Sequence, residues 1–430
     1  MIYSETVNPS SKKILTLIIA AYTILALCYS FATKLKYGPD EPAHFIYIRS
    51  IATTFSLPAI SHTETPNEHC TATHEGHQPP LYYLLMAVPF AISRLLGAQD
   101  DTLWRILRLA NIPIGAAGIW MVYLLAKEYF AGEGYALTCA AFVAGIPTAS
   151  YMAGVINNEN LITVLFTWAM IPLLRYFKTG EMSRRESAKV GVLIGLALLT
   201  KAQSFVLIFL MLVAAAASLV RRGPASWKDA FGTITLSLGT AAMVSGWWFA
   251  RNIAIYGTPT PHSLYNPVVP GGILALAAAP ALGAELLYRL TMALYGYFWV
   301  PFWIVWPFVG SLRQVVYPIA LVNIVVLGGL FARFRRGNSF DLAALGFLLL
   351  APLMIYVLWL QYILTVDQMA NLQGRLFLST AAIAGIVWII GLDGLLKSAM
   401  AKLCGIVAGC IVLIGSNAAV IYCALRLYAG

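Results

Sequence analysis

Charge is scarce in this chain. Only 11% of its 430 residues are Asp, Glu, Lys or Arg, whereas 60% are hydrophobic, and the mean hydropathy is +0.77. A soluble domain carries roughly 25% charged residues, so the composition excludes a soluble enzyme. It predicts an all-α polytopic membrane protein, because many apolar runs approach the roughly 20 residues that a membrane-spanning helix needs.

Acidic residues are fewer than basic ones, 18 against 28, which gives a net charge of +10. No basic tail or soluble basic domain is present to bind nucleic acid, so the excess is better explained as a signal of membrane topology. The sequence also lacks internal repeats, low-complexity tracts, a nucleotide-binding glycine loop and a separate soluble domain. We therefore expect residues 1–430 to form a single transmembrane domain.

Cysteine is also rare. The chain has six, and all but Cys70 fall inside apolar spans, where cysteine usually behaves as a small hydrophobic side chain. The sequence therefore offers no disulfide framework, and redox chemistry is not expected.

Apolar runs predict about eleven transmembrane helices. The candidate ranges are 14–32, 104–126, 134–152, 160–177, 188–200, 203–220, 231–250, 314–332, 342–361, 375–392 and 403–424. Prolines interrupt two further apolar stretches, 80–97 and 273–309, which are ambiguous. The arrangement of all later spans depends on whether 80–97 crosses the membrane.

The positive-inside rule favours a helix at 80–97 that does not cross. More than half of the Lys and Arg residues then lie in short loops on one side, at 12–13, 127, 175–189, 221–228, 333–336 and 397–402. The long segments 33–103 and 251–313 become extracytoplasmic. Residues 41–54 of the first segment are expected to form an interfacial helix with Phe45, Ile48, Ile51 and Ala52 towards lipid.

The most distinctive polar motif follows the first span and reads Pro39-Asp40-Glu41-Pro42, with His44 close behind. Ionisable residues at a membrane boundary are costly to keep there and indicate a functional site. The prolines place both carboxylates in a turn, where partial desolvation would raise the pKa of an acid towards that of a working base. The alternative is that Asp40 simply caps the helix that follows.

The remaining polar candidates fall on the same outer side. Three cations, Lys201, Arg251 and Arg375, suggest a receptor for a lipid phosphate, although each alone could be a snorkelling side chain. The candidates for substrate binding are His77, Gln78, Tyr82, Asn158, Glu159 and Gln373. Glu159 could instead cap its helix or hold a cation together with Asp40, and Tyr82 suits an interfacial aromatic belt.

A zinc site is an alternative use of the histidine-rich first outer segment. His69, His74 and His77 are short-spaced ligands near Cys70, but their spacing fits no standard zinc pattern.

Six motifs in order resemble those of the GT-C superfamily of membrane glycosyltransferases, which includes protein O-mannosyltransferases and the lipid A aminoarabinose transferase. These motifs are Asp40-Glu41, Pro79–Tyr83, Asn158-Glu159, Leu199-Thr200-Lys201, Trp247–Asn252 and Gln373–Arg375. From this sequence we do not expect the C-terminal soluble domain that many members use for their acceptors.

The resemblance implies an inverting transfer of a sugar from a polyprenyl-phosphate donor to a hydroxyl of a glycan, lipid or protein acceptor. It implies that Asp40 is the general base, and that Glu41 and His44 orient the base or the acceptor. Because phosphate is already a leaving group, no cofactor is required, and a divalent metal is an alternative. The expected location is the outer face of a bacterial cytoplasmic membrane.

Two other functions stay open at this point. A polymerase or ligase for lipid-diphosphate glycans would also use cations on the outer face. A transporter of lipid-linked glycans is disfavoured, because the middle of each span is nearly uncharged and no inverted repeat is visible.

Overall fold

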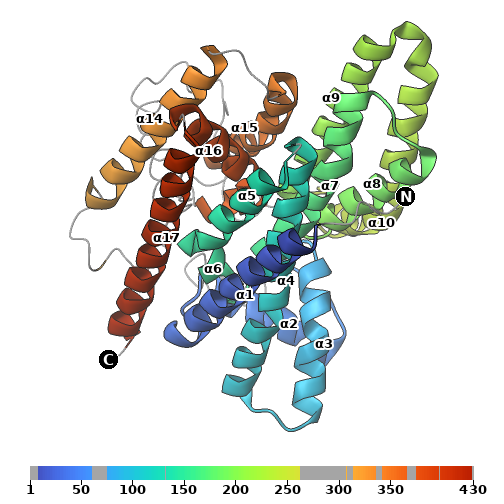
Figure 1. The fold of residues 1–430 in the computed structure, drawn as a ribbon. Helices are drawn as coiled ribbons and strands as arrows, with labels where there is room; N and C mark the ends of the chain where they lie inside the picture. Colours follow the sequence, from blue (N-terminus) through green and yellow to red (C-terminus); the bar gives the residue numbers. More distant parts are fainter. Residues whose placement is uncertain are drawn as a thin grey trace.

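The structure is a computed structural model that describes residues 8–60, 75–130, 132–261, 307, 313–335, 341–365, 374–396 and 398–428. Every regular element among them is a helix (Figure 1). The all-α membrane class is therefore confirmed, and a helix is present at each of the predicted spans. Much of the predicted second outer segment, 251–313, lies outside the described residues.

The described residues up to Tyr256 form ten α-helices. Their bounds are α1 Pro9–Ala32, α2 Glu41–Thr54, α3 Leu81–Leu95, α4 Asp100–Tyr129, α5 Glu133–Gly145, α6 Pro147–Ala153, α7 Glu159–Thr179, α8 Arg184–Leu198, α9 Phe205–Arg222 and α10 Trp227–Tyr256. Helix α4 is central, packing against α1, α3, α5, α6 and α7. Figure 1 shows α8, α9 and α10 on one side of this group.

The second half of the described chain adds α14 Arg313–Arg335, α15 Leu342–Thr365, the 3-10 helix η5 Gly374–Thr380, α16 Ala381–Leu395 and α17 Ala399–Tyr428. These helices lie on the other side of α4 and α7 in Figure 1. Helix α16 packs against α5 and α14, and η5 packs against α7.

Seven of the described helices are long and apolar enough to span a membrane, or eight when the bent pair α5–α6 is taken as one. The predicted count of about eleven is thus not confirmed. Helix α3 has 15 residues and is about 22 Å long at 1.5 Å per residue. That is short of the roughly 30 Å hydrocarbon core, which favours the arrangement in which 80–97 does not cross.

The predicted span 134–152 is broken by 68° between α5 and α6. Pro147 causes the break, because proline has no amide hydrogen and its ring clashes with the preceding turn. The carbonyls freed at the break find other donors: Ser150 Oγ donates to Ala144 O at 3.1 Å and Asn417 Nδ2 to Gly145 O at 2.8 Å. Gly154, after α6, lets α1 approach closely, since a Cβ there would lie 2.6 Å from Ala26 O.

The lipid-facing stripe predicted for residues 41–54 is wrong, although the helix itself is confirmed as α2. Phe45, Ile48 and Ile51 are buried inside the protein. Helix α3 covers this face, and the Phe45 ring stacks on Trp104 of α4 with 4.0 Å between the centroids. A short amphipathic pattern looks the same whether its apolar face meets lipid or protein.

The loops rich in basic residues meet at one end of the molecule, as the topology requires. Arg175, near the end of α7, pairs with Glu128 at the end of α4 at 2.6 Å, and Arg222 of α9 pairs with Asp229 of α10 at 3.3 Å. Asp393 of α16 binds three partners: Arg333 at the end of α14, Lys402 at the start of α17, and Tyr135 at the start of α5.

Single cysteines introduced into a cysteine-free background test this sidedness. Ser183→Cys at the start of α8 and Ser56→Cys after α2 are both exposed and are expected to be labelled by a membrane-impermeant maleimide from opposite sides. Labelling of both from the same side of sealed vesicles contradicts the topology.

Candidate functional site

Five segments bring ionisable side chains together at the end of the molecule opposite the basic loops. Glu159 starts α7, whose other end carries Arg175, and Lys201 follows α8, which begins at Arg184. The other members are Asp40 before α2, Glu75 before α3 and Arg375 in η5. The electrostatic interactions of Glu75 and Arg375 connect these side chains into one cluster.

Asp40 and Arg375 form an ion pair although they are distant in the chain. The Asp40 side chain is 44% exposed and that of Arg375 only 9%. Asp40 has the left-handed backbone conformation, with φ +54°, and its side chain makes no capping hydrogen bond to α2. The alternative that Asp40 serves as a helix cap therefore fails, and its carboxylate faces a buried guanidinium.

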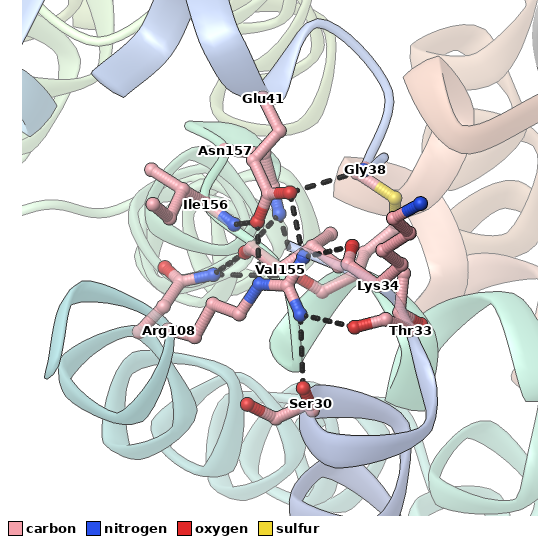
Figure 2. Close-up of polar contacts among 11 residues, drawn as sticks. Ser30, Thr33, Lys34, Gly38, Glu41, Arg108, Val155, Ile156 and Asn157 are labelled. Atoms are coloured by element: carbon pink, nitrogen blue, oxygen red, sulfur yellow. Dashed lines mark hydrogen bonds and ion pairs between the residues drawn. The ribbon is translucent and has the colours of Figure 1, made fainter. Parts of the chain in front are cut away.

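The neighbouring acid, Glu41, has a different environment, which Figure 2 shows. Glu41 and Arg108 of α4 are both completely buried and pair in a bidentate manner, with Nε to Oε1 and Nη2 to Oε2 each at 2.7 Å. Backbone amides of Gly38 and Ile156 donate to the same carboxylate at 3.0 and 3.1 Å. Four hydrogen bonds thus hold the Glu41 side chain.

Arg108 uses its remaining hydrogens on the end of α1 (Figure 2). It donates to the carbonyl oxygens of Ser30, Thr33 and Lys34 at 2.7 to 2.9 Å. This one guanidinium therefore joins α1, α2 and α4. Because Asp40 immediately precedes Glu41, the same contacts fix the turn that carries Asp40.

Glycine is needed at position 38 for this turn. A Cβ there would lie 2.9 Å from Glu41 Cδ and 3.0 Å from Val155 Cβ. Asn111 supports the other side of the network by donating to Val155 O at 2.6 Å, which positions the chain just before Ile156.

Lys201 pairs with Glu159, and both are largely buried. Next to them, Asn158 Nδ2 donates to Gln78 Oε1 at 3.4 Å. The backbone holds the two sides together, because the Leu81 amide donates to Leu199 O at 2.8 Å. Four predicted polar residues, Gln78, Asn158, Glu159 and Lys201, are thus neighbours.

Glu75 is buried beside these pairs. Desolvation, with repulsion from Asp40, raises the pKa of its carboxyl group to about 8, while Lys201, Arg375 and a hydrogen bond with Gln78 oppose the rise. The raised pKa favours the protonated, neutral form of Glu75. The two cations then face two carboxylates, Asp40 and Glu159, and the cluster is balanced in charge.

His44 and Tyr82 are buried, and both make hydrogen bonds to neighbouring segments. His44 Nδ1 hydrogen-bonds Tyr83 Oη at 2.9 Å, and the Tyr83 ring stacks on Tyr47 at 3.8 Å. Tyr82 Oη accepts from the Asn157 amide at 3.0 Å. These aromatic residues tie α2 and α3 to the segment before α7.

Arg251 contacts backbone carbonyl oxygens and an aromatic ring. Its guanidinium donates to the carbonyls of Leu57 and Pro58 at 3.3 and 3.1 Å and lies over the Trp248 ring. It thereby connects the end of α10 with the chain that follows α2. Its predicted partnership with Lys201 and Arg375 stays a prediction.

Three predicted residues, Gln373, His69 and His74, lie outside the described part of the chain. His77 is half-buried. Among the residues that the structure does describe, no group of three or more His, Cys, Asp or Glu side chains could hold a metal ion.

Sequence reasoning did not assign a role to Arg108 or to Glu75. Arg108 could have been found, because a charge within the apolar run 104–126 must have a partner in a membrane helix. Glu75 carried no such signal, since it lies in a polar segment among other acids and histidines.

Residues 77–248 match the family model described as dolichyl-phosphate-mannose-protein mannosyltransferase. This range contains Gln78, Tyr82, Asn158, Glu159 and Lys201. The chain therefore resembles the GT-C glycosyltransferases. No curated protein matches it by sequence.

The fold is similar to that of the oligosaccharyltransferase of Archaeoglobus fulgidus. The structure tethered to an acceptor peptide aligns with a TM-score of 0.56 and 13% identity, covering 98% of this chain and 56% of the other. The complex with an inhibitory peptide and a dolichol-phosphate gives 0.54 and 13%, with coverage of 96% and 55%. This chain thus spans little more than half of that protein's length.

ArnT from Cupriavidus metallidurans bound to undecaprenyl phosphate is also a match, with 14% identity, a TM-score of 0.40, and coverage of 88% and 77%. At 13% identity the likeness to the archaeal structures establishes the fold, and it agrees with the GT-C class that the sequence motifs predict.

Removal of the Glu41 carboxylate is expected to destabilise the protein strongly. Glu41→Ala leaves Arg108 buried without its charge partner, which costs about 3–5 kcal/mol for comparable buried pairs. Unfolding of the purified protein in detergent measures the change. The matched control is Glu181→Ala: Glu181 is 73% exposed and lies 3.9 Å from Arg222, so we expect a loss below about 1 kcal/mol. An equal decrease in the free energy of unfolding for both variants contradicts a special role of the buried pair.

Proposed function

We propose that this protein is an inverting glycosyltransferase that uses a polyprenyl-phosphate sugar as its donor. The observation that carries the proposal is the pairing of Asp40 with Arg375 beside Glu159 with Lys201 at one end of the helix bundle. A carboxylate next to two largely buried cations supplies both a base and a site for an anionic leaving group. The likeness to GT-C proteins supports this class of reaction.

In the proposed reaction an acceptor hydroxyl attacks C1 of the donor sugar from the side opposite the phosphate. Asp40 takes the hydroxyl proton, the new C–O bond forms, and the bond between C1 and the phosphate oxygen breaks with inversion. The polyprenyl phosphate leaves with its electron pair and added negative charge. Lys201 and Arg375 stabilise that charge, which is the main electrostatic demand of the step.

The ion pairs of the free protein suit this sequence of events. A phosphate that binds Arg375 competes with Asp40 for the same guanidinium. Donor binding would then release the Asp40 carboxylate, which is partly exposed, to act on the acceptor. Glu41 serves as a positioning residue in this proposal, because its contact with Arg108 holds the turn that carries Asp40.

The remaining assignments belong to the same proposal. His44 supports the base through the packing of α2, and Arg251 and Gln373 complete the phosphate and substrate contacts. The acceptor is a glycan, lipid or protein hydroxyl. We place the site on the outer face of a bacterial cytoplasmic membrane, because the opposite end collects the basic loops.

A divalent metal is a further component to test. The archaeal oligosaccharyltransferase has a structure in complex with Zn and sulfate, and His69, His74 and His77 are the candidate ligands in this chain. The proposed transfer needs no metal, since the two cations already face the leaving phosphate.

Asp40→Asn is expected to lower sugar transfer at least about a hundredfold, because amide nitrogen and oxygen cannot take the proton that a general base accepts. The measurement is transfer of radiolabelled sugar from a polyprenyl-phosphate monosaccharide in membranes that contain equal amounts of each variant. Asp229→Asn, in an exposed pair at the other end, is the control and should transfer normally. Near-normal turnover of Asp40→Asn removes this residue from the base role.

The choice of donor separates the proposal from a polymerase or ligase. We expect the purified protein to consume a radiolabelled polyprenyl-phosphate monosaccharide and to leave a lipid-diphosphate oligosaccharide intact. The opposite preference identifies a polymerase or ligase, and movement of either lipid across vesicles without chemical change identifies a transporter. Transfer that stops with EDTA and returns with added zinc assigns a metal to the reaction.

A further inference from the structure

Two buried carboxyl groups of the site each keep one oxygen free of any hydrogen bond within the described residues. These atoms are Oε2 of Glu75 and Oε2 of Glu159, whose residues are only 4% and 2% exposed. A buried acceptor without a donor costs about 1–3 kcal/mol. Such exceptions call for an explanation, and a ligand that supplies the missing donor is one.

The two residues that carry these oxygens lie in the same part of the site. Glu159 binds Lys201 through its other oxygen, and the same Lys201 interacts with the charge of Glu75. The Gln78 backbone amide donates to Glu75 O at 2.9 Å, and the Gln78 side chain accepts from Asn158, the residue before Glu159. The segments that carry Glu75 and Glu159 are therefore linked through Gln78 and Asn158, next to the pair of Glu159 with Lys201.

The carboxyl and amide groups in this part of the site are suited to bind hydroxyl groups. A hydroxyl donates one hydrogen bond and accepts others, so it can serve a carboxyl oxygen and an amide at once. Neighbouring hydroxyls on a sugar ring would meet Glu75, Glu159 and the amide pair together. The match holds in either protonation state of Glu75, because a neutral carboxyl group still accepts through its carbonyl oxygen.

We propose that Glu75 and Glu159 form the subsite that binds the hydroxyl groups of the donor sugar, next to the cations that hold its phosphate. This inference rests on the proposed function. It adds Glu75 as a specificity-determining residue, and it identifies the donor class as a sugar with at least two free hydroxyls near its phosphate-linked carbon.

Binding measurements test the subsite without an acceptor. The probes are short polyprenyl phosphates that carry glucose, mannose, galactose or arabinose. The reference ligand, called the bare lipid phosphate, is the same lipid phosphate with a methyl group in place of the sugar, so that its charge equals that of the sugar-bearing lipids. We expect the best sugar to bind the purified full-length protein at least about tenfold more tightly than the bare lipid phosphate. Replacing single hydroxyls of that sugar by fluorine removes a donor and should weaken binding by about 10–100-fold at one or more positions.

Variants of Glu75 test whether this residue supplies the affinity that the sugar adds. Glu75→Leu keeps the volume but removes the acceptor. We expect this variant to lose most of the affinity that the sugar adds, measured against the bare lipid phosphate on the same variant. Glu75→Gln retains an acceptor oxygen and should recover much of the affinity that the sugar adds. The control is Thr167→Val in α7, where a buried hydroxyl also has no partner among the described residues; it should change neither affinity.

The inference is overturned if the sugar adds no affinity, if no fluorinated sugar binds more weakly, or if Glu75→Leu discriminates as the unmodified protein does. If Glu75→Leu does not fold, the fluorinated series on the unmodified protein decides alone. Failure of every polyprenyl phosphate to bind overturns the proposed function as well, which distinguishes the two failures.

Discussion

The buried ion pair between Glu41 and Arg108 is the interaction on which this structure depends. Removing two such charges from water costs several kcal/mol per ion, so the pair persists only if its geometry and hydrogen bonds compensate. Here the carboxylate has four hydrogen bonds, and the guanidinium binds three further carbonyls. These hydrogen bonds connect the end of α1, the start of α2, the first third of α4 and the segment before α7.

That connection explains why two adjacent acids differ so much. Glu41 is completely buried and fully engaged, whereas Asp40, one residue earlier, is half-exposed and faces Arg375 from the far end of the chain. The two side chains pair with guanidiniums of different elements, Glu41 with Arg108 of α4 and Asp40 with Arg375 of η5. In the proposed function the first acid acts on substrate, and the second keeps the first in place.

Much of the charged cluster was predictable, because charges are rare enough in this chain to stand out. Asp40, Glu159, Lys201 and Arg375 interrupt apolar runs at span ends, and the topology placed them on one side. What was not predictable is how they pair. Arg108 went unnoticed inside an apolar run, and the contacts of Arg251 with two carbonyl oxygens depend on tertiary structure that no local pattern encodes.

The errors in the fold have a similar origin. Hydropathy alone cannot tell a helix face that meets lipid from one that meets protein, so the buried side of α2 was assigned to lipid. Neither does it reveal that Pro147 breaks a span when neighbouring side chains such as Asn417 can satisfy the freed carbonyls. Both features depend on which residues pack against the helix in the tertiary structure.

An experimental structure with a bound polyprenyl phosphate tests the central claim most directly. We predict density for the phosphate within hydrogen-bonding distance of Lys201 and Arg375, with Asp40 released from Arg375 and the Glu41–Arg108 pair unchanged. A phosphate bound away from both cations, with the Asp40–Arg375 pair intact, would contradict it.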